Sequence, residues 1–125
     1  MSKPDQKFPK TIRLIRQADF DRVHSGQFYA VDRTLVVKAI SNGLPITRLG
    51  LSVSRRVGNA VVRNHWKRRI REAFRQQRCD LPQGLDLVVR PKKGAVCEFG
   101  AITKSLKRLV GKIENRIQKS ESGKN

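Results

Sequence analysis

The segment from residue 59 to residue 78 repeats its apolar residues at the spacing of an α-helix and gathers positive charge on the opposite side. At about 100° per residue, Val62, Trp66, Ile70 and Ala73 fall on one stripe. A second stripe, roughly opposite, carries Asn64, Lys67, Arg68, Arg71, Arg75 and Arg78, with Arg63 and Arg69 on its flanks. The pattern predicts a long helix over 59–78, capped by Asn59, whose apolar stripe docks on a core and whose cationic stripe faces outward.

The charge of this segment is unusual for a helix whose outward side contacts only solvent. Between residues 59 and 78, seven Lys and Arg side chains stand against a single acid, Glu72. Glu–Lys pairs stabilise an exposed helix, whereas like charges repel. The whole chain shows the same imbalance, with 28 Lys and Arg, 10 Asp and Glu, and a formal net charge of +18. A polyanionic partner is therefore expected, and the preference for arginine, which grips phosphate with a planar fork and stacks on bases, favours RNA.

Other classes of protein agree less well with the sequence. No apolar run approaches the roughly 20 residues that cross a bilayer, and the N-terminus lacks a signal region, so we expect a cytoplasmic protein without a membrane partner. Cys79 and Cys97 are expected as free thiols. The acidic residues are scattered, and His24 and His65 are isolated. This distribution argues against a self-contained nuclease and against a metal bound strongly by the protein.

Hydrophobic patterning divides the chain into a basic N-terminal arm (1–16), one RNA-binding domain (17–118) and a disordered tail (119–125). Within the domain, "QADFDRVHS" predicts a short helix ended by Gly26. Strands are expected at 28–31, 33–40, 48–54 and 85–90. A last long helix places its apolar residues on one stripe: Ile102, Leu106, Leu109, Val110, Ile113 and Ile117. The order describes an α+β sandwich, a single domain with one four-stranded mixed sheet and helices packed on it.

The segment 48–54 alternates between core residues and small ones. Leu49, Leu51 and Val53 point to one side, and Gly50, Ser52 and Ser54 point to the other. Small side chains at Ser52 and Ser54 would let a nucleic-acid backbone approach closely. Phe20 either stacks on a base or anchors the first helix, and both alternatives remain open. Tyr29 and Trp66 are expected in the core.

The sequence "RRVGNAVVRNHWKRRIREAF" resembles the signature of a known family, the protein subunit of bacterial ribonuclease P. The signature comprises a basic pair, Gly-Asn-Ala-Val, an Arg-Asn-x-x-Lys-Arg core and a further Arg. In this chain these positions are Arg55, Arg56, residues 58–61, Arg63, Asn64, Lys67, Arg68 and Arg71. The elements "ADF", "RLGLSVS" and "LDLVVR" flank it in the right order, so the resemblance covers most of residues 18–90. It implies a fold like a domain of a small-subunit ribosomal protein, with a left-handed βαβ crossover that the usual right-handed rule would not predict.

The resemblance also implies a function. A chain of this family would bind a catalytic RNA subunit and the 5′ leader of precursor tRNA, and so assist endonucleolytic removal of the leader. Hydrolysis would then belong to the RNA subunit and its Mg²⁺, with no cofactor held strongly by the protein. The alternative is a structural RNA-binding protein of the ribosomal type, without a role in cleavage.

Two sets of site residues follow from the resemblance. RNA-binding residues are expected at Arg55, Arg56, Asn59, Arg63, Asn64, Lys67, Arg68, Arg71 and Arg75. A leader-binding cleft is expected at Phe20, His24, Lys38, Ser52 and Ser54. His24 and Lys38 depart from the family pattern, because an aromatic residue is frequent at the first position and also occurs at the second. Stacking on leader bases would therefore be weaker here, with attraction to phosphate in compensation.

Overall fold

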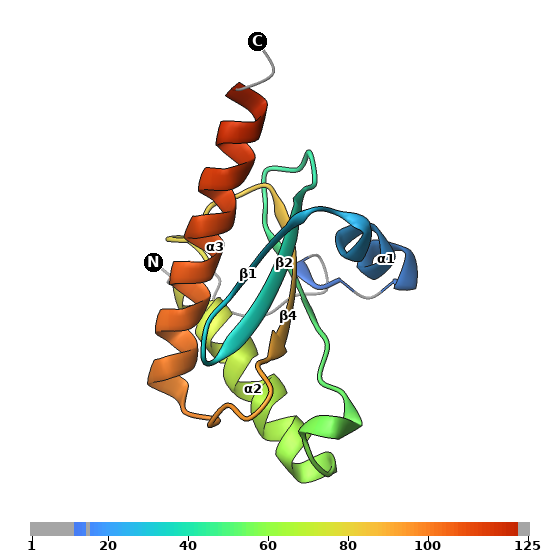
Figure 1. Ribbon diagram of the computed structural model, residues 1–125, viewed down its shortest axis with the longest axis vertical. Helices are drawn as coiled ribbons and strands as arrows, with labels where there is room; N and C mark the ends of the chain where they lie inside the picture. The colour runs from blue at the N-terminus through green and yellow to red at the C-terminus, as the bar shows by residue number, and fades with distance from the viewer. Residues whose placement is uncertain (1–11, 15, 123–125) are drawn as a thin grey trace, which may run out of the picture.

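The computed structural model of the protein describes residues 12–14 and 16–122. Within these residues, the helices and strands follow in the order α1 (Gln17–Ser25), β1 (Phe28–Val31), β2 (Leu35–Ser41), β3 (Arg48–Leu51), α2 (Ala60–Gln77), β4 (Leu85–Pro91) and α3 (Phe99–Ser122). A short 3₁₀ helix, η2 (Arg55–Val57), connects β3 to α2. The predicted α+β class is confirmed (Figure 1).

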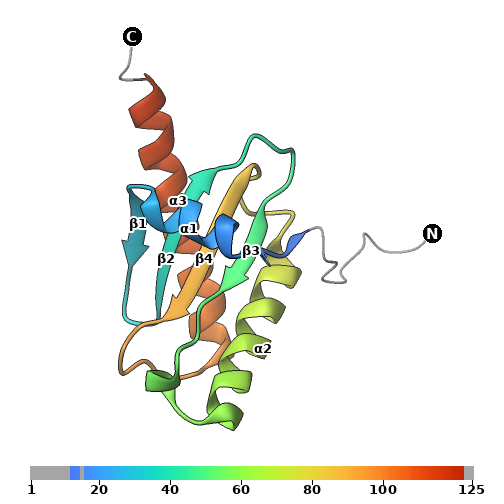
Figure 2. The same ribbon diagram turned by 90° about the vertical axis from the view of Figure 1, so that its right-hand side faces the viewer.

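The four strands form one mixed sheet in the order β1-β2-β4-β3. The β1–β2 and β2–β4 pairs are antiparallel, and β3 lies parallel to β4. In Figure 2, β3 and β4 run in the same direction, β4 lies to the left of β3, and α1 lies in front of the sheet while α3 lies behind it. Because α2 packs with α3 on that far face, the β3–α2–β4 connection is a left-handed crossover, as the resemblance implied.

The two faces of the sheet have different cores. Alternate residues such as Leu49, Leu87 and Val89 pack with α2 and α3 in the main hydrophobic cluster. A smaller cluster on the other face joins Leu14, Val23 and Val88 to the partly buried Phe20 and Ile40, and it lies beneath α1. We call this second side the α1 face. The predicted alternation in β3 therefore holds, because Gly50 points to the α1 face and lies under the ring of Phe20.

The two long helices follow their predicted patterns. The side-chain oxygen of Asn59 accepts a hydrogen bond from the Val62 N–H at 3.0 Å, so this residue caps α2 as expected. Trp66, Ile70, Ala73 and Phe74 are buried. In α3, the predicted stripe is also buried: Ile102, Leu106, Leu109, Val110, Ile113 and Ile117. The C-terminal end of α3 projects past the sheet (Figure 1).

The predicted boundaries of the domain need two corrections. Ile12 and Leu14 are buried, and the Leu14 N–H donates to the Leu49 carbonyl at 2.9 Å, so the end of the expected arm belongs to the core. Residues 1–11 lie outside the described part of the chain. At the other end, α3 continues to Ser122, into the expected tail. Residues 123–125 are also outside the described part.

Three local predictions were wrong. The strand expected over 48–54 ends at Leu51, because the chain then turns into η2, although the Ser52 N–H still donates to the Val89 carbonyl at 3.0 Å. Val62, expected in the core, is 38% exposed, since it lies in the first turn of α2 and packs over Gly58. Tyr29 was expected in the core and is 56% exposed on the edge strand β1.

Asp32 ties the β1–β2 turn to α3. Its carboxylate accepts hydrogen bonds from the Thr34 and Leu35 N–H groups at 2.8 and 3.0 Å and from the Ser105 hydroxyl at 2.8 Å, and it pairs with Arg108. Burial by itself would raise the pKa of Asp32. The hydrogen bonds outweigh that effect and lower the pKa from 3.8 to about 2.

The depressed pKa of Asp32 predicts a specific loss of stability in acid. A group whose pKa is lower in the folded state stabilises the fold above its unfolded pKa, and that contribution disappears as the pH falls from about 4 to about 2. The contribution is about 2 kcal/mol. Urea unfolding across this range should therefore show less pH dependence in Asp32→Asn than in wild type. Equal pH dependence in the two proteins would contradict the assignment.

Candidate nucleic-acid interface

The outward side of α2 forms a shallow depression of about 270 Å³. We call it the cationic α2 surface, and its lining residues are Asn64, Lys67, Arg68, Arg71, Glu72 and Arg75. One helix supplies all of them because they recur every three or four residues. The opposite side of α2 is buried in the core, which fixes the direction of this surface. The structure thus brings together five of the predicted RNA-binding residues.

The charges of the cationic α2 surface are not balanced within it. Glu72 pairs with Arg75, whose Nε donates at 2.9 Å, and also accepts a hydrogen bond from Gln76 at 2.8 Å. The hydrogen bonds from Arg75 lower the pKa of Glu72. Glu72 is the only acid among the residues that line this surface, and it is already paired with Arg75. Lys67 and Arg68 form no ion pair within the described chain. The charges of these two side chains are therefore not neutralised within the described chain, and a nearby anion would bind them.

Arg71 lies close to a second cation, Arg13. Burial lowers the pKa of its guanidinium, and the charge of nearby Arg13 lowers it further. Arg13 reaches this position because its segment pairs with Leu49 at the edge of β3. Two cations from separate segments thus lie close together, an arrangement that an anion would stabilise.

The remaining predicted RNA-binding residues lie outside the depression, toward the N-terminal end of α2. Arg55 and Arg56 are exposed on η2, and the side-chain oxygen of Asn59 is used by the helix cap. Arg63 buries its Nε without a hydrogen-bond partner among the described residues. The first turn of α2 contains no acid to offset the positive end of the helix dipole. This end of α2 is therefore also suited to an anion.

On the α1 face, the structure brings three predicted leader-binding residues near one another. The ring of Phe20 lies so close to Gly50 that a Cβ there would be 2.8 Å from Phe20 Cζ. One helical turn later, His24 Nδ1 is 3.4 Å from Lys38 Nζ on β2. Phe20 is half-buried in the smaller cluster, so its role as an anchor of α1 is confirmed, while stacking on a base stays a prediction. Ser52 and Ser54 follow Gly50 beyond the end of β3, where Ser52 is half-buried and Ser54 exposed.

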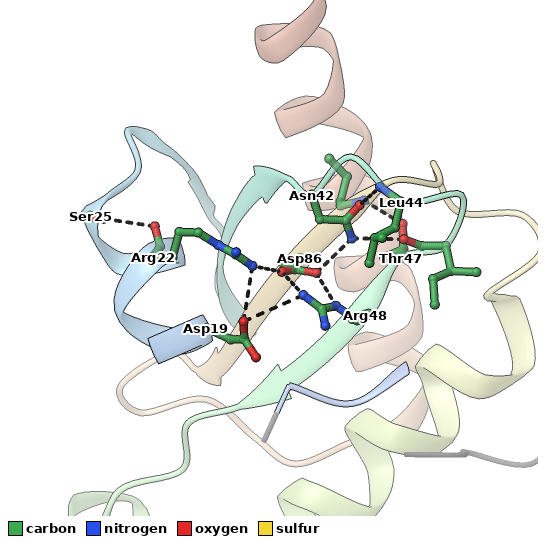
Figure 3. A network of polar contacts seen from close by, with 10 residues as sticks. Asp19, Arg22, Ser25, Asn42, Leu44, Thr47, Arg48 and Asp86 are labelled. Atoms are coloured by element: carbon green, nitrogen blue, oxygen red, sulfur yellow. Dashed lines mark hydrogen bonds and ion pairs between the residues drawn. The ribbon is translucent and has the colours of Figure 1, made fainter. Parts of the chain in front are cut away.

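A buried ionic network holds α1 against the sheet (Figure 3). The side chain of Asp86 on β4 is fully buried. It accepts hydrogen bonds from Arg48 Nε at 2.8 Å and Nη2 at 2.6 Å, from Arg22 at 2.7 Å and from Asn42 at 2.8 Å. Asp19 at the start of α1 lies 3.3 Å from Arg22 and 3.8 Å from Arg48. The network therefore links α1 to β3, β4 and the β2–β3 loop.

This network was not predicted from the sequence, although one signal was present. Asp86 stands within the apolar strand "LDLVVR", and a buried carboxylate needs partners. Burial alone would raise the pKa of Asp86, but the hydrogen bonds from Arg48, Asn42 and Arg22 outweigh it and lower the pKa. The partners come from distant segments, so the sequence did not identify them.

Other predicted features of the site can be compared with the structure. Cys79 and Cys97 are free thiols, as expected. Among residues 12–14 and 16–122, no group of three or more His, Cys, Asp or Glu side chains could hold a metal ion. No helix in the same part of the chain is long and apolar enough to span a membrane.

The fold and the cationic α2 surface define a class, a small α+β protein with a positively charged surface suited to a polyanion. Comparisons with known proteins then specify the family. The Ribonuclease P family matches residues 8–114. Ribonuclease P protein components of Caldanaerobacter subterraneus and Citrifermentans bemidjiense are 36% and 37% identical, over 82% and 87% of this chain and 90% and 94% of theirs.

Solved structures agree with this assignment. The Staphylococcus aureus RNase P protein has a TM-score of 0.72 and 32% identity, over 82% of this chain and 94% of its own. The Thermotoga maritima protein has a TM-score of 0.68 and 33% identity, over 75% and 90%. The chain therefore belongs to the ribonuclease P protein family, the protein subunits of the endoribonuclease that processes the 5′ end of tRNA.

The buried network predicts that Asp86→Asn destabilises the protein by about 3 kcal/mol, because two arginines lose their ionic partner. Urea unfolding followed by circular dichroism measures the change. Arg48→Gln should cost more than Arg22→Gln, since Arg48 makes two hydrogen bonds to Asp86 and its side chain is 20% exposed, against 51% for Arg22. A stability of Asp86→Asn equal to wild type would show that the network contributes nothing.

Proposed function

We propose that the cationic α2 surface binds the catalytic RNA subunit of ribonuclease P and that the α1 face binds the 5′ leader of precursor tRNA. The chain would thereby assist endonucleolytic removal of the leader to give the mature 5′ end. One observation carries the proposal: Lys67, Arg68 and Arg71 share an outward surface whose only acid, Glu72, is already paired with Arg75.

The arrangement of the layers supports two simultaneous contacts. The α2 helix packs on one side of the sheet and α1 on the other, so RNA bound to α2 leaves the α1 face open. Arg13 lies at the edge of β3 between these sides, near Arg71 and paired with Leu49. A substrate strand crossing the α1 face would therefore reach the catalytic RNA around this edge.

Each surface would recognise RNA by a different physical means. On α2, arginine and lysine neutralise phosphates and release counterions, so binding weakens steeply with salt. On the α1 face, the half-buried ring of Phe20 offers a stacking surface over β3, and Lys38 adds positive charge on β2, next to His24. The small side chains of Ser52 and Ser54 leave room for a nucleic-acid backbone.

The proposed chemistry belongs to the RNA subunit. Mg²⁺ held by that RNA would supply the nucleophile and stabilise the leaving group. The described residues of the protein do not form a donor set for a metal, so no step is assigned to a protein-held ion. The residues of this chain bind, orient and neutralise charge. The proposal keeps the cytoplasmic location that was expected from the sequence.

Removing charge from α2 should weaken binding of the RNA subunit and reduce its dependence on salt. For Lys67→Gln/Arg68→Gln/Arg71→Gln, we expect the slope of log K against log salt to fall by about 2 to 3, close to one unit for each lost phosphate contact. Filter binding at several salt concentrations measures this slope.

The matched control removes the same charge from α3 through Lys104→Gln/Lys107→Gln/Lys112→Gln, at three exposed positions. Equal loss in both triple variants would show that only net charge matters, and the specific role of α2 would then fail.

Removing the ring of Phe20 should weaken binding of leader-bearing substrate but not of mature tRNA. We expect a loss on the order of tenfold for Phe20→Ala in the reconstituted complex, because one stacked base is lost. Phe20→Leu keeps most of the apolar packing beneath α1, so it separates lost stacking from lost folding. Equal losses for precursor and mature tRNA would favour a structural RNA-binding protein instead.

A further inference from the structure

Tyr29 is the exposed aromatic residue that the proposed function leaves unused. It lies on the edge strand β1, with 56% of its surface exposed. Its neighbours Phe28 and Ala30 pack with the main core, so alternation directs the Tyr29 side chain to the α1 face. A single exposed tyrosine is common on an edge strand. Tyr29 differs from an ordinary exposed tyrosine in its position relative to Phe20 and Lys38.

Tyr29 ends a row of residues that crosses the whole sheet. The register pairs Tyr29 with Lys38, Lys38 with Val88, and Val88 with Gly50, so one residue from each strand lies in the row. Phe20 covers the row at Gly50, and His24 meets it at Lys38. The α1 helix therefore follows this row and ends at Ser25. Tyr29 extends the row to the outermost strand.

The length of the row corresponds to a few nucleotides of single-stranded RNA. Neighbouring strands lie about 4.8 Å apart, which places Tyr29 about 14 Å from Gly50. A stacked strand of nucleic acid advances about 3.4 Å per nucleotide, so this distance corresponds to about four nucleotides, or fewer if the strand is extended. The two ends of the row thus carry aromatic rings. Between them, Lys38 offers a cation, whereas Val88 is buried beneath α1.

The backbone of Tyr29 is held from the opposite layer. Arg116 on α3 donates a hydrogen bond to the Tyr29 carbonyl oxygen. This contact adds a tether from α3 to β1, while the tyrosine ring remains on the other side. A tethered backbone lowers the entropic cost of presenting the ring to a ligand.

We propose that Tyr29 is a stacking position for a nucleotide of the single-stranded 5′ leader, beyond the nucleotides held near Phe20. This proposal rests on the proposed function of the α1 face. Tyr29 adds an aromatic ring to the row, on the strand next to Lys38. The ligand class is single-stranded RNA, because stacking accepts any base and Lys38 attracts the phosphates.

Affinity for precursor tRNAs with leaders of increasing length provides the first test. In the reconstituted complex, wild type should gain affinity in steps as the leader lengthens. Tyr29→Ala should lack the last step, a loss on the order of tenfold, while Tyr29→Phe should keep it. Val96→Ala, at an exposed apolar position in the β4–α3 loop, serves as the matched control.

The outcomes separate the two proposals. If Tyr29→Ala follows wild type at every leader length while Phe20→Ala loses the dependence on the leader, the role of Tyr29 is overturned and the proposed function stands. If wild type itself shows no dependence on the leader, both proposals fail.

A spectroscopic measurement tests the contact without a substitution. Tyr29 is the only tyrosine of the chain, so 3-fluorotyrosine gives one fluorine resonance from this position. A leader oligonucleotide added to the full-length protein should shift this resonance, and mature tRNA at equal phosphate concentration should not. An unchanged resonance at saturating leader would overturn the proposal.

Discussion

The buried carboxylate of Asp86 is the interaction on which the α1 face depends. It lies on β4, inside the sheet, and its partners arrive from β3, the β2–β3 loop and α1. Only 9 residues long, α1 contributes few large apolar side chains, so hydrophobic burial alone holds it weakly. The charged hydrogen bonds fix its orientation over the sheet. The Asp86 network therefore helps to set the positions of Phe20 and His24 relative to Lys38, although it contacts none of these three side chains.

The α2 helix keeps its unmixed charge because its other side supplies most of its stability. Trp66, Ile70 and Phe74 are fully or almost fully buried in the main core. Burial of each such side chain contributes about 1.5 to 3 kcal/mol, whereas an ion pair along a helix contributes about 0.2 to 0.5 kcal/mol. The apolar contribution is much larger, so the helix tolerates an outward surface on which Glu72–Arg75 is the one ion pair among the described residues. The same surface remains available for phosphate.

Sequence patterns between nearby residues predicted much of the structure. The spacing of apolar residues located α2 and α3, and alternation identified both faces of β3, because each pattern reflects a regular local geometry. Contacts between distant segments were not predicted, including the partners of Asp86 and the pairing of Arg13 with Leu49. Local patterns also do not predict the handedness of the crossover. Only the resemblance to the family predicted that it is left-handed. In the site, α2 was recognised from charge, whereas Tyr29 was misplaced because a tyrosine in a strand suits either face.

Both outer strands of the sheet are partly covered. At the β3 edge, the Leu14 N–H bonds the Leu49 carbonyl, and at the β1 edge, Arg116 bonds the Tyr29 carbonyl. An open strand edge invites pairing with another chain, which leads to aggregation. The free protein is also protected by its net charge of +18, since copies repel one another. An anion that neutralises the protein would remove that repulsion, whereas the covered edges would still block pairing between strands of different copies.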